Sequence, residues 1–410
     1  MLPFTICMLA SAGAPLTADN AVVLALENAH ALQLQEVALA ERDKEAGRMD
    51  LQPLRATATG RSIDALARGD LSVQNLYGEL SWQPPALEEF GTAQAIAHAG
   101  VTRDMLRGSE ERAALASEVR QLHARVLLMR EERDVVMRAV ELSGKIKTSV
   151  DDQLRAEVAT RMQASIASLD LLDSKVDLDE LEARLARSEA RLSQLLGIDL
   201  PPLLGPAPVC VAPPPAESVL AQARTHAWRL KQIDVDRTSL RDREARAWLR
   251  RIPWVSALSL GVLQNRPIDH RTEVHVGLTV ELPVFRLVRG VDSELSVARA
   301  RVESDAIDAE DALDGEVETA VTRQAASAAL VQAHGGEVDA LAKQGEAAIN
   351  AAVVAGSVAS VDAAALHKRT QQSRRTHLHA IARCVEASLE VQRLIGDPAS
   401  SSGAPQDSPR

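Results

Sequence analysis

The sequence predicts a mainly α protein with a small β part, in which long helical hairpins and pairs of short strands occur twice, giving four strands per chain. Landmark motifs recur in the same order about 200 residues apart in the 410-residue chain. Aromatic residues contribute only 2%, so Ala, Leu and Val carry the apolar fraction, as is typical of long, closely packed helices. Two stretches of alternating apolar residues each precede a much longer segment with helical periodicity.

The duplication is carried by matching motifs. Ala164–Asp170 (ASIASLD) is matched by Gly356–Asp362 (GSVASVD), and a Leu-Leu-Gly run ending at Gly197 returns as a Leu-Ile-Gly run. We therefore predict a first structural repeat over residues 15–197 and a second over 216–396. Each repeat has the order helix, strand pair, long helix, turn and shorter helix.

The first repeat opens with a helix that Thr17 or Asp19 caps and that reaches about Arg48, before Pro53. Strands are expected over about 54–60 and 72–83. In the second repeat the period-two alternation is clearer, and it predicts strands over about 255–262 and 274–282. Each of these strands has one apolar and one polar face.

The long helix of the second repeat is expected over about 291–355, where apolar residues recur every three or four positions. At 1.5 Å per residue this helix is about 95 Å long. Its counterpart in the first repeat is expected over about 87–163. Gly335-Gly336 and Ser143-Gly144 are candidate bends within these helices.

The remaining segments predict export and an extended connection. Residues 1–14 combine an apolar run with an Ala-x-Ala-like exit, which indicates an incomplete signal peptide without its basic region. Residues 198–215 form a Pro-rich connector, and 397–410 read as a disordered tail. Cys7, Cys210 and Cys384 show no metal-binding spacing. Cys210 and Cys384 can pair, although nothing in the sequence requires it.

The sequence gives no support for an enzyme. It contains no phosphate-binding loop, no hydrolase or metalloprotease motif and no paired acids in a pocket context, so we expect no catalytic residue, metal site or cofactor. The net charge of −11 argues against a nucleic-acid partner. His367 and His379 are interpreted as solvated helix histidines, and Glu131-Glu132 as part of a solvated helix face with nearby Arg partners.

Two runs resemble a known family. Arg251–Gly261 and Val276–Phe285 resemble strand segments of TolC-like outer-membrane efflux proteins, and Gly356–Asp362 resembles the motif at their helical-hairpin tip. The resemblance covers about residues 16–396. It implies a homotrimer in the bacterial outer membrane, with a shared 12-stranded β-barrel in lipid and an α-helical tunnel in the periplasm. It also implies docking on a periplasmic adaptor protein and an inner-membrane pump.

The unpaired edges of a four-stranded sheet favour the same assembly. Four short strands cannot close a barrel alone, and an open sheet edge cannot persist in hydrocarbon, so several chains must share one barrel.

The resemblance also suggests functional residues. Asp362 falls at the position of the family's pore-aperture aspartate, and Asp170 is read as its first-repeat counterpart. The alternative is that each Asp caps its helix. The tip residues Ala164, Ser165, Gly356 and Ser357 are expected to dock the adaptor. Val353, Val358 and Ala365 replace polar tip residues of the family, which argues against its usual polar tip contacts.

A second class of function stays open: a soluble helical scaffold or interaction protein without a pore. It accounts for the helices and the acidity but poorly for the paired alternating strands. The sequence does not decide whether metal ions, drugs or protein are exported.

Overall fold

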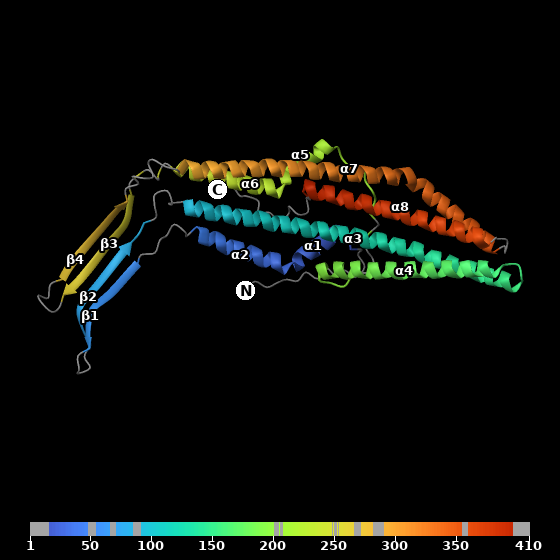
Figure 1. The fold of residues 1–410 in the computed structure, drawn as a ribbon, viewed down its shortest axis with the longest axis horizontal. Coiled ribbons are helices and arrows are strands. Elements are labelled where there is room, and N and C mark those ends of the chain that lie inside the picture. The colour runs from blue at the N-terminus through green and yellow to red at the C-terminus, as the bar shows by residue number, and fades with distance from the viewer. Residues whose placement is uncertain are drawn as a thin grey trace. The chain divides into compact units, whose positions relative to one another are not determined.

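The computed structural model describes residues 16–47, 55–65, 71–84, 92–200, 205, 208–247, 249, 252, 254–265, 272–281, 291–354 and 360–396. Within these residues the fold is mostly helical, with a few antiparallel strands (Figure 1). In chain order the elements are α1 (Ala18–Asn28), α2 (His30–Ala46), β1 (Arg55–Ala65), β2 (Leu71–Trp82), α3 (Thr92–Arg155), α4 (Arg161–Leu196), α5 (Ala216–His226), α6 (Trp228–Arg246), β3 (Trp254–Asn265), β4 (Thr272–Glu281), α7 (Val291–Val354) and α8 (Ser360–Ile395).

Element lengths recur between the two halves of the chain. The helices α3 and α7 both have 64 residues, and α4 and α8 both have 36. The helix α7 begins and ends 199 positions after α3, and α8 begins and ends 199 positions after α4, as the first residues Thr92 and Val291 and Arg161 and Ser360 show. Gly197 and Gly396, which share this offset and follow the two shorter helices, have left-handed φ angles of 66° and 76°. This conformation suits glycine at a helix C-terminus.

The described chain divides into two compact units, and each unit takes residues from both halves. One unit comprises Met1–Leu32, Ser109–Ala227 and Asp311–Arg410, and the other comprises Gln33–Gly108 and Trp228–Glu310. The first unit holds all of α4 and α8 and the later parts of α3 and α7, with which they form two helical hairpins (Figure 1). The second unit holds the sheet together with α6, most of α2 and the first parts of α3 and α7.

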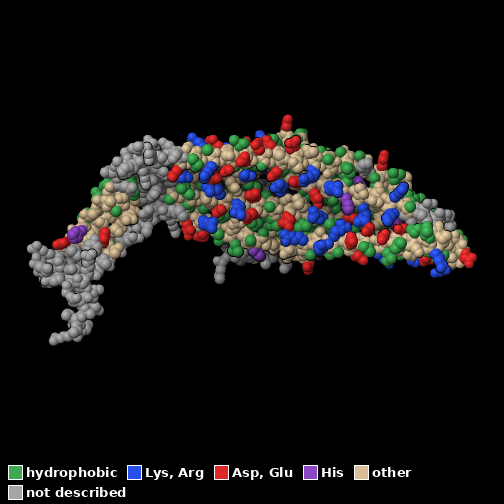
Figure 2. Space-filling view, in the orientation of Figure 1, with side chains coloured by type: hydrophobic (Ala, Val, Ile, Leu, Met, Phe, Trp, Pro, Cys, Tyr) green, Lys and Arg blue, Asp and Glu red, His purple; other side chains and the backbone are tan. Residues whose placement is uncertain are grey.

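The hairpin unit buries an aliphatic core. Val22 on α1, Val119 and Val126 on α3, and Leu192 and Leu196 on α4 are all at most 1% exposed. Salt bridges Arg130–Glu189 and Arg191–Glu118 flank this core between α3 and α4. Charged side chains otherwise lie mixed along the visible face of the helices (Figure 2). The packing therefore follows the Ala, Leu and Val composition.

The single opening helix predicted from Thr17 or Asp19 to about Arg48 is wrong. Two helices are present, because the chain leaves helical geometry at Ala29, where φ is −78° and ψ is 67°. The second half breaks in the same way at Ala227, with ψ of 108°. Thr17, one of the two predicted capping residues, caps α1. Its side chain accepts a hydrogen bond from the backbone N–H of Asn20.

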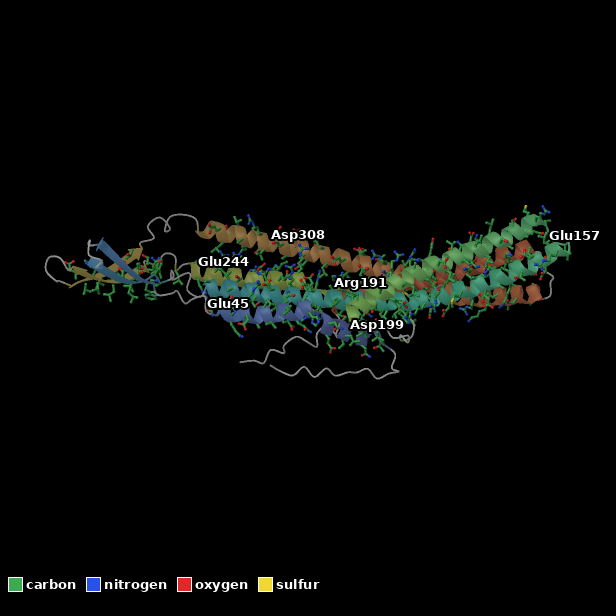
Figure 3. The ribbon with its side chains drawn as sticks, turned by 90° about the horizontal axis from the view of Figure 1, so that it is seen from below. Glu45, Glu157, Arg191, Asp199, Glu244 and Asp308 are labelled. Carbon is green, nitrogen blue, oxygen red and sulfur yellow. A yellow bond between two sulfur atoms is a disulfide. The ribbon has the colours of Figure 1, made fainter. Side chains whose placement is uncertain are left out.

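The first long helix was also predicted too long. The helix α3 ends at Arg155, and a turn over 156–160 leads into α4. Glu157, at this turn in Figure 3, has a φ of 61°. Thr160 and Gln163 form a reciprocal capping box that starts α4. This Thr-x-x-Gln signal was present in the sequence. The two candidate bends, Ser143-Gly144 and Gly335-Gly336, lie inside α3 and α7, and neither interrupts its helix.

The four strands form one antiparallel sheet in the order β1-β2-β3-β4. The strand pair of the first half is therefore joined to that of the second half through β2 and β3, with Leu80 opposite Leu260. Each predicted strand segment is a strand in the described chain, and β1 and β3 continue past their predicted ends. A bulge between Val255 and Ala257 interrupts the β3–β4 register.

Candidate functional site

One face of the sheet is aliphatic and exposed. Leu258 lies opposite Leu278, Leu260 opposite Val276 and Val262 opposite Val274, so these side chains share one face. Their exposed fractions run from 39% at Leu258 to 76% at Val276. Leu80 and Trp82 continue this face onto β2. Because a contiguous exposed apolar surface is costly in water, this face requires an apolar environment or a partner.

The opposite face is small and polar. Ser259 lies opposite both Ser81 and Gly277, and Ala257 lies opposite Thr279. The Ser259 hydroxyl occupies the space beside Gly277, where an added Cβ would come within 2.4 Å of it. A sheet with one aliphatic and one polar face can separate hydrocarbon from water.

The sheet ends at β1 on one side and β4 on the other. Within the described residues no further strand pairs with either of these edges. Unpaired N–H and C=O groups make such an edge a template for another chain.

The turn between α3 and α4 places two of the predicted docking residues. Ala164 and Ser165 lie in the first turns of α4, and the Ser165 hydroxyl donates to the Arg161 carbonyl. Ser165 is exposed and Ala164 is half-buried. Gly356 and Ser357 lie outside the described residues.

The helix bounds correct the interpretation of the two aspartates. Asp362 is the third residue of α8, and the third residue of α4 is Gln163, so Gln163 and not Asp170 is the positional counterpart of Asp362. The motif match had shifted the alignment by seven positions, which is two helical turns. Asp170 lies inside α4 and does not cap it, because Thr160 does.

Asp170 lines a cavity of about 360 Å³ between α3, α4 and α8. The walls include Ser143 and Ile146 from α3, and from α8 the side chains of His367, Gln371 and Arg375. Three acidic side chains of α4 line it at intervals of three and four residues: Asp170, Asp173 and Asp177. The first-repeat and second-repeat hairpins therefore meet at a polar cavity.

An ion-pair network joins the same three helices. Glu132 of α3 is 5% exposed and accepts from Arg375 at 3.2 Å and from His379 at 3.3 Å. Arg375 also donates to Asp177 of α4 at 2.6 Å. The interpretation of Glu132 as part of a solvated face is thus wrong, since its partners come from a helix more than 240 positions away.

His367 is also not the solvated histidine that the sequence suggested. It is 6% exposed, and its Nε2 donates to the Ala139 carbonyl of α3 at 3.1 Å. Burial lowers the pKa of the His367 imidazole, and the bond to Ala139 together with the carboxylates of Glu346 and Asp170 partly offsets this. The neutral form of His367 therefore fits this interface.

A disulfide links Cys210 to Cys384, with a Cα–Cα distance of 5.5 Å. It fixes the Pro-rich connector to α8 across a sequence separation of 174 residues. Gln324 of α7 adds a hydrogen bond to the Val211 carbonyl. The pairing that the sequence left open is present.

Two further features concern the described residues. None of their helices combines the length and hydropathy that a membrane-spanning helix needs. Among the same residues, no group of three or more His, Cys, Asp or Glu side chains is arranged to hold a metal ion.

Comparison with solved structures assigns the architecture. The outer membrane protein VceC from Vibrio cholerae aligns with a TM-score of 0.69 at 14% identity, covering 92% of this chain and 96% of that one. The CmeC outer membrane channel of Campylobacter jejuni gives 0.70 at 13%, covering 92% and 85%. The chain has a TolC-like fold.

The open state of the Neisseria gonorrhoeae MtrE outer membrane channel aligns with a TM-score of 0.66 at 17% identity, covering 92% of this chain and 88% of that one. No family model matches the sequence, and no curated protein matches it. The TolC-like fold thus persists here at a sequence identity that comparisons of sequence do not detect.

Proposed function

We propose that this protein is the outer-membrane channel of a tripartite efflux or secretion system, a passive export conduit that docks on a periplasmic adaptor and an inner-membrane pump. The exposed aliphatic face of the sheet carries the proposal. Leu260, Val276 and Leu278 lie on a surface that hydrocarbon would cover at no cost, while Ser259 and Thr279 would face water.

The open edges at β1 and β4 support a homotrimer. Three chains with four strands each give a closed 12-stranded barrel, which removes both edges in lipid. Trp82 and Trp254 lie at the same end of β2 and β3, where an aromatic girdle would meet the interface.

The disulfide supports a location outside the cytosol. Cys210–Cys384 requires an oxidising compartment such as the periplasm. The helical unit would lie there, with Ala164, Ser165, Gly356 and Ser357 at the adaptor-docking tip. Asp362, and with it Asp170 deeper along the helices, would line the aperture and favour cations. A soluble scaffold does not account for the aliphatic face.

The decisive experiment combines oligomer mass with conductance. Purified in detergent, the protein is expected to be a trimer that conducts ions in planar lipid bilayers. A monomer released from cells without detergent would overturn the proposal in favour of the scaffold.

A matched pair of variants tests the strand faces. Leu278→Arg should impair membrane assembly, because Arg near the bilayer midplane costs about 2–4 kcal/mol. Thr279→Arg, on the adjacent residue and the opposite face, should assemble. Equal assembly of both variants would mean that the lipid-facing side is wrongly assigned.

The aperture assignment is tested by Asp362→Ala. We expect reduced cation selectivity in bilayer recordings with an unchanged melting temperature. Unchanged selectivity would remove Asp362 from the pore.

A further inference from the structure

The cavity between α3, α4 and α8 has the size and lining of a small-molecule site. Its volume of about 360 Å³ lies in the usual range of such sites, about 300–1,000 Å³. Ile146 and Ala167 give it an aliphatic wall, and each is at most 4% exposed. Hydroxyl and amide side chains make up much of the remaining lining: Ser143, Ser174, Gln371, Gln372 and Thr376. All of the lining residues belong to one compact unit of a single chain.

Two buried polar atoms of α8 lack partners at this cavity. The Nε2 of His367 donates to the Ala139 carbonyl, so the Nδ1 of the neutral ring is a hydrogen-bond acceptor. Burial lowers the pKa of His367, which favours this neutral ring. Among the described residues neither this Nδ1 nor the amide Nε2 of Gln371 has a partner, although His367 is only 6% exposed.

One hydroxyl group can satisfy both atoms. His367 and Gln371 are four positions apart, so they are neighbours on one face of α8. A hydroxyl donates one hydrogen bond and accepts others, so it can donate to the Nδ1 of His367 and accept from the amide of Gln371. Because an unpaired buried polar group is costly, a ligand that supplies such a hydroxyl gains binding energy.

The α4 wall of the cavity carries carboxylates that a cation can reach. In the part of the chain that the structure describes, no hydrogen bond or ion pair engages the Asp170 carboxylate, which lies close enough to His367 to act on its charge. Asp173, three positions along the same face, is held only by Lys368 at 3.9 Å, and both side chains are exposed. Asp177, by contrast, is bonded to Arg375.

An ammonium group suits these two carboxylates better than a metal ion does. No group of three or more His, Cys, Asp or Glu side chains within the described ranges is arranged to hold a metal. An ammonium group needs no such arrangement, and it donates up to three hydrogen bonds. It can therefore bond to Asp170 and Asp173 together. An ammonium group and a hydroxyl on one small carbon skeleton describe an amino sugar.

We infer that this cavity binds a small amino sugar. Its ammonium group bonds to Asp170 and Asp173, and one of its hydroxyls bridges His367 and Gln371. The carbon skeleton lies against Ile146. The inference goes beyond the proposed channel and does not depend on it, because one chain supplies every contact. Since the ligand touches α4 and α8 together, it also favours the arrangement in which the two hairpins lie side by side.

Calorimetric titration of the full-length protein in detergent tests the site, with glucosamine as the probe. We expect saturable binding of glucosamine. Glucose lacks the ammonium group and cyclohexylamine lacks the hydroxyls, so each should bind several-fold more weakly. Absence of glucosamine binding would overturn the inference. Cyclohexylamine binding as tight as that of glucosamine would overturn the hydroxyl bridge and with it the class of ligand.

A matched pair of aspartate variants locates the binding. Asp170→Asn keeps the side-chain size but removes the charge, and it should weaken glucosamine binding about tenfold. Asp179→Asn is the control, because Asp179 is an exposed aspartate of α4 outside the cavity. It should bind glucosamine as the unaltered protein does. Equal weakening in both variants would mean that the general negative charge of α4 attracts the ligand, which would overturn the site.

The α8 side of the site is tested by Gln371→Leu, which removes the amide donor. It should weaken glucosamine binding several-fold while cyclohexylamine binding stays the same. Equal losses for both ligands would count against the bridging hydroxyl. Oligomer mass and conductance measured on the same samples separate this inference from the channel proposal. A conducting trimer that does not bind glucosamine would overturn only the site, whereas a monomer that binds it would overturn only the channel.

Discussion

The helices α4 and α8 hold equivalent places in their hairpins but present opposite surfaces. Each has 36 residues, and each follows a 64-residue helix. On α8 the face toward the first hairpin carries His367 and Arg375, which bond to α3. On α4 the corresponding positions hold Ser168 and Val176, and Val176 is exposed. Helix length is thus the same in the two repeats while the two surfaces differ, since α8 makes polar contacts within the chain and α4 exposes an apolar side chain.

Covalent attachment is a second difference between these helices. Cys384 ties α8 to the connector, whereas the equivalent residue of α4, Leu185, is held by packing alone and is 4% exposed. We expect Cys384→Ala to have the largest effect, lowering the free energy of unfolding by about 2–5 kcal/mol. Thermal melts of the detergent-purified protein with and without reductant measure this.

Cys210→Ala is the control, since it removes the same bond from the other side. It should match Cys384→Ala, and reductant should add nothing to either variant. A wild-type melt that reductant does not change would show that the bond contributes no stability.

Making α8 resemble α4 tests whether the polar contact is needed for stability. Glu132→Val removes the buried carboxylate that pairs with Arg375. Because Arg375 keeps its bond to Asp177 and its side chain is 23% exposed, we expect the free energy of unfolding to fall by roughly 1–3 kcal/mol. Adding Arg375→Val replaces the ion pair with two apolar side chains. We expect it to recover at least half of the loss, because apolar replacement of an ion pair is often neutral.

The double-variant cycle is measured by chemical denaturation. A double variant less stable than either single variant would show that the contact depends on charge.

The sequence predicts the elements better than it predicts the contacts between them. Alternation over 274–282 and apolar periodicity over 291–355 place β4 and α7 almost to the residue, because both are local patterns. Glu132 and Arg375 meet only after two hairpins pack, and no local pattern indicates that meeting. His367 was misread for the same reason, since its burial depends on α3.

The predicted pairing of Asp170 with Asp362 between the two repeats is wrong for a different reason. A seven-residue motif match shifted the alignment by two helical turns, and a heptad-like helix tolerates such a shift because each turn resembles the one before it. The capping box at Thr160 and Gln163 marked the true start of α4 and was the better guide.

Acid should weaken the contact between α8 and α3. Burial lowers the pKa of His367, so the unfolded chain binds a proton at a higher pH than the folded chain does. The stability that the buried, neutral His367 contributes is complete above pH 6.5, the ordinary pKa of histidine. It is lost as the pH falls toward the lower pKa of His367 in the folded chain. The loss is at most about 1.4 kcal/mol per pH unit.

Denaturation curves between neutral and mildly acidic pH check this prediction. Burial lowers the pKa of His123 as well, so His367→Gln should reduce the slope without abolishing it. Gln can still donate to the Ala139 carbonyl. An unchanged slope in His367→Gln would assign the acid sensitivity elsewhere.

The smallest effect is expected where α8 meets α4 at the surface. Lys368 and Asp173 lie 3.9 Å apart, and their side chains are 66% and 71% exposed. Solvent screens such a pair, so Lys368→Ala should change the free energy of unfolding by less than about 0.5 kcal/mol. Denaturation at low and high salt should give the same small difference. A loss comparable to that of Glu132→Val would mean that this pair is covered in the assembled protein, and that the region between α4 and α8 is less open than it is in the single chain.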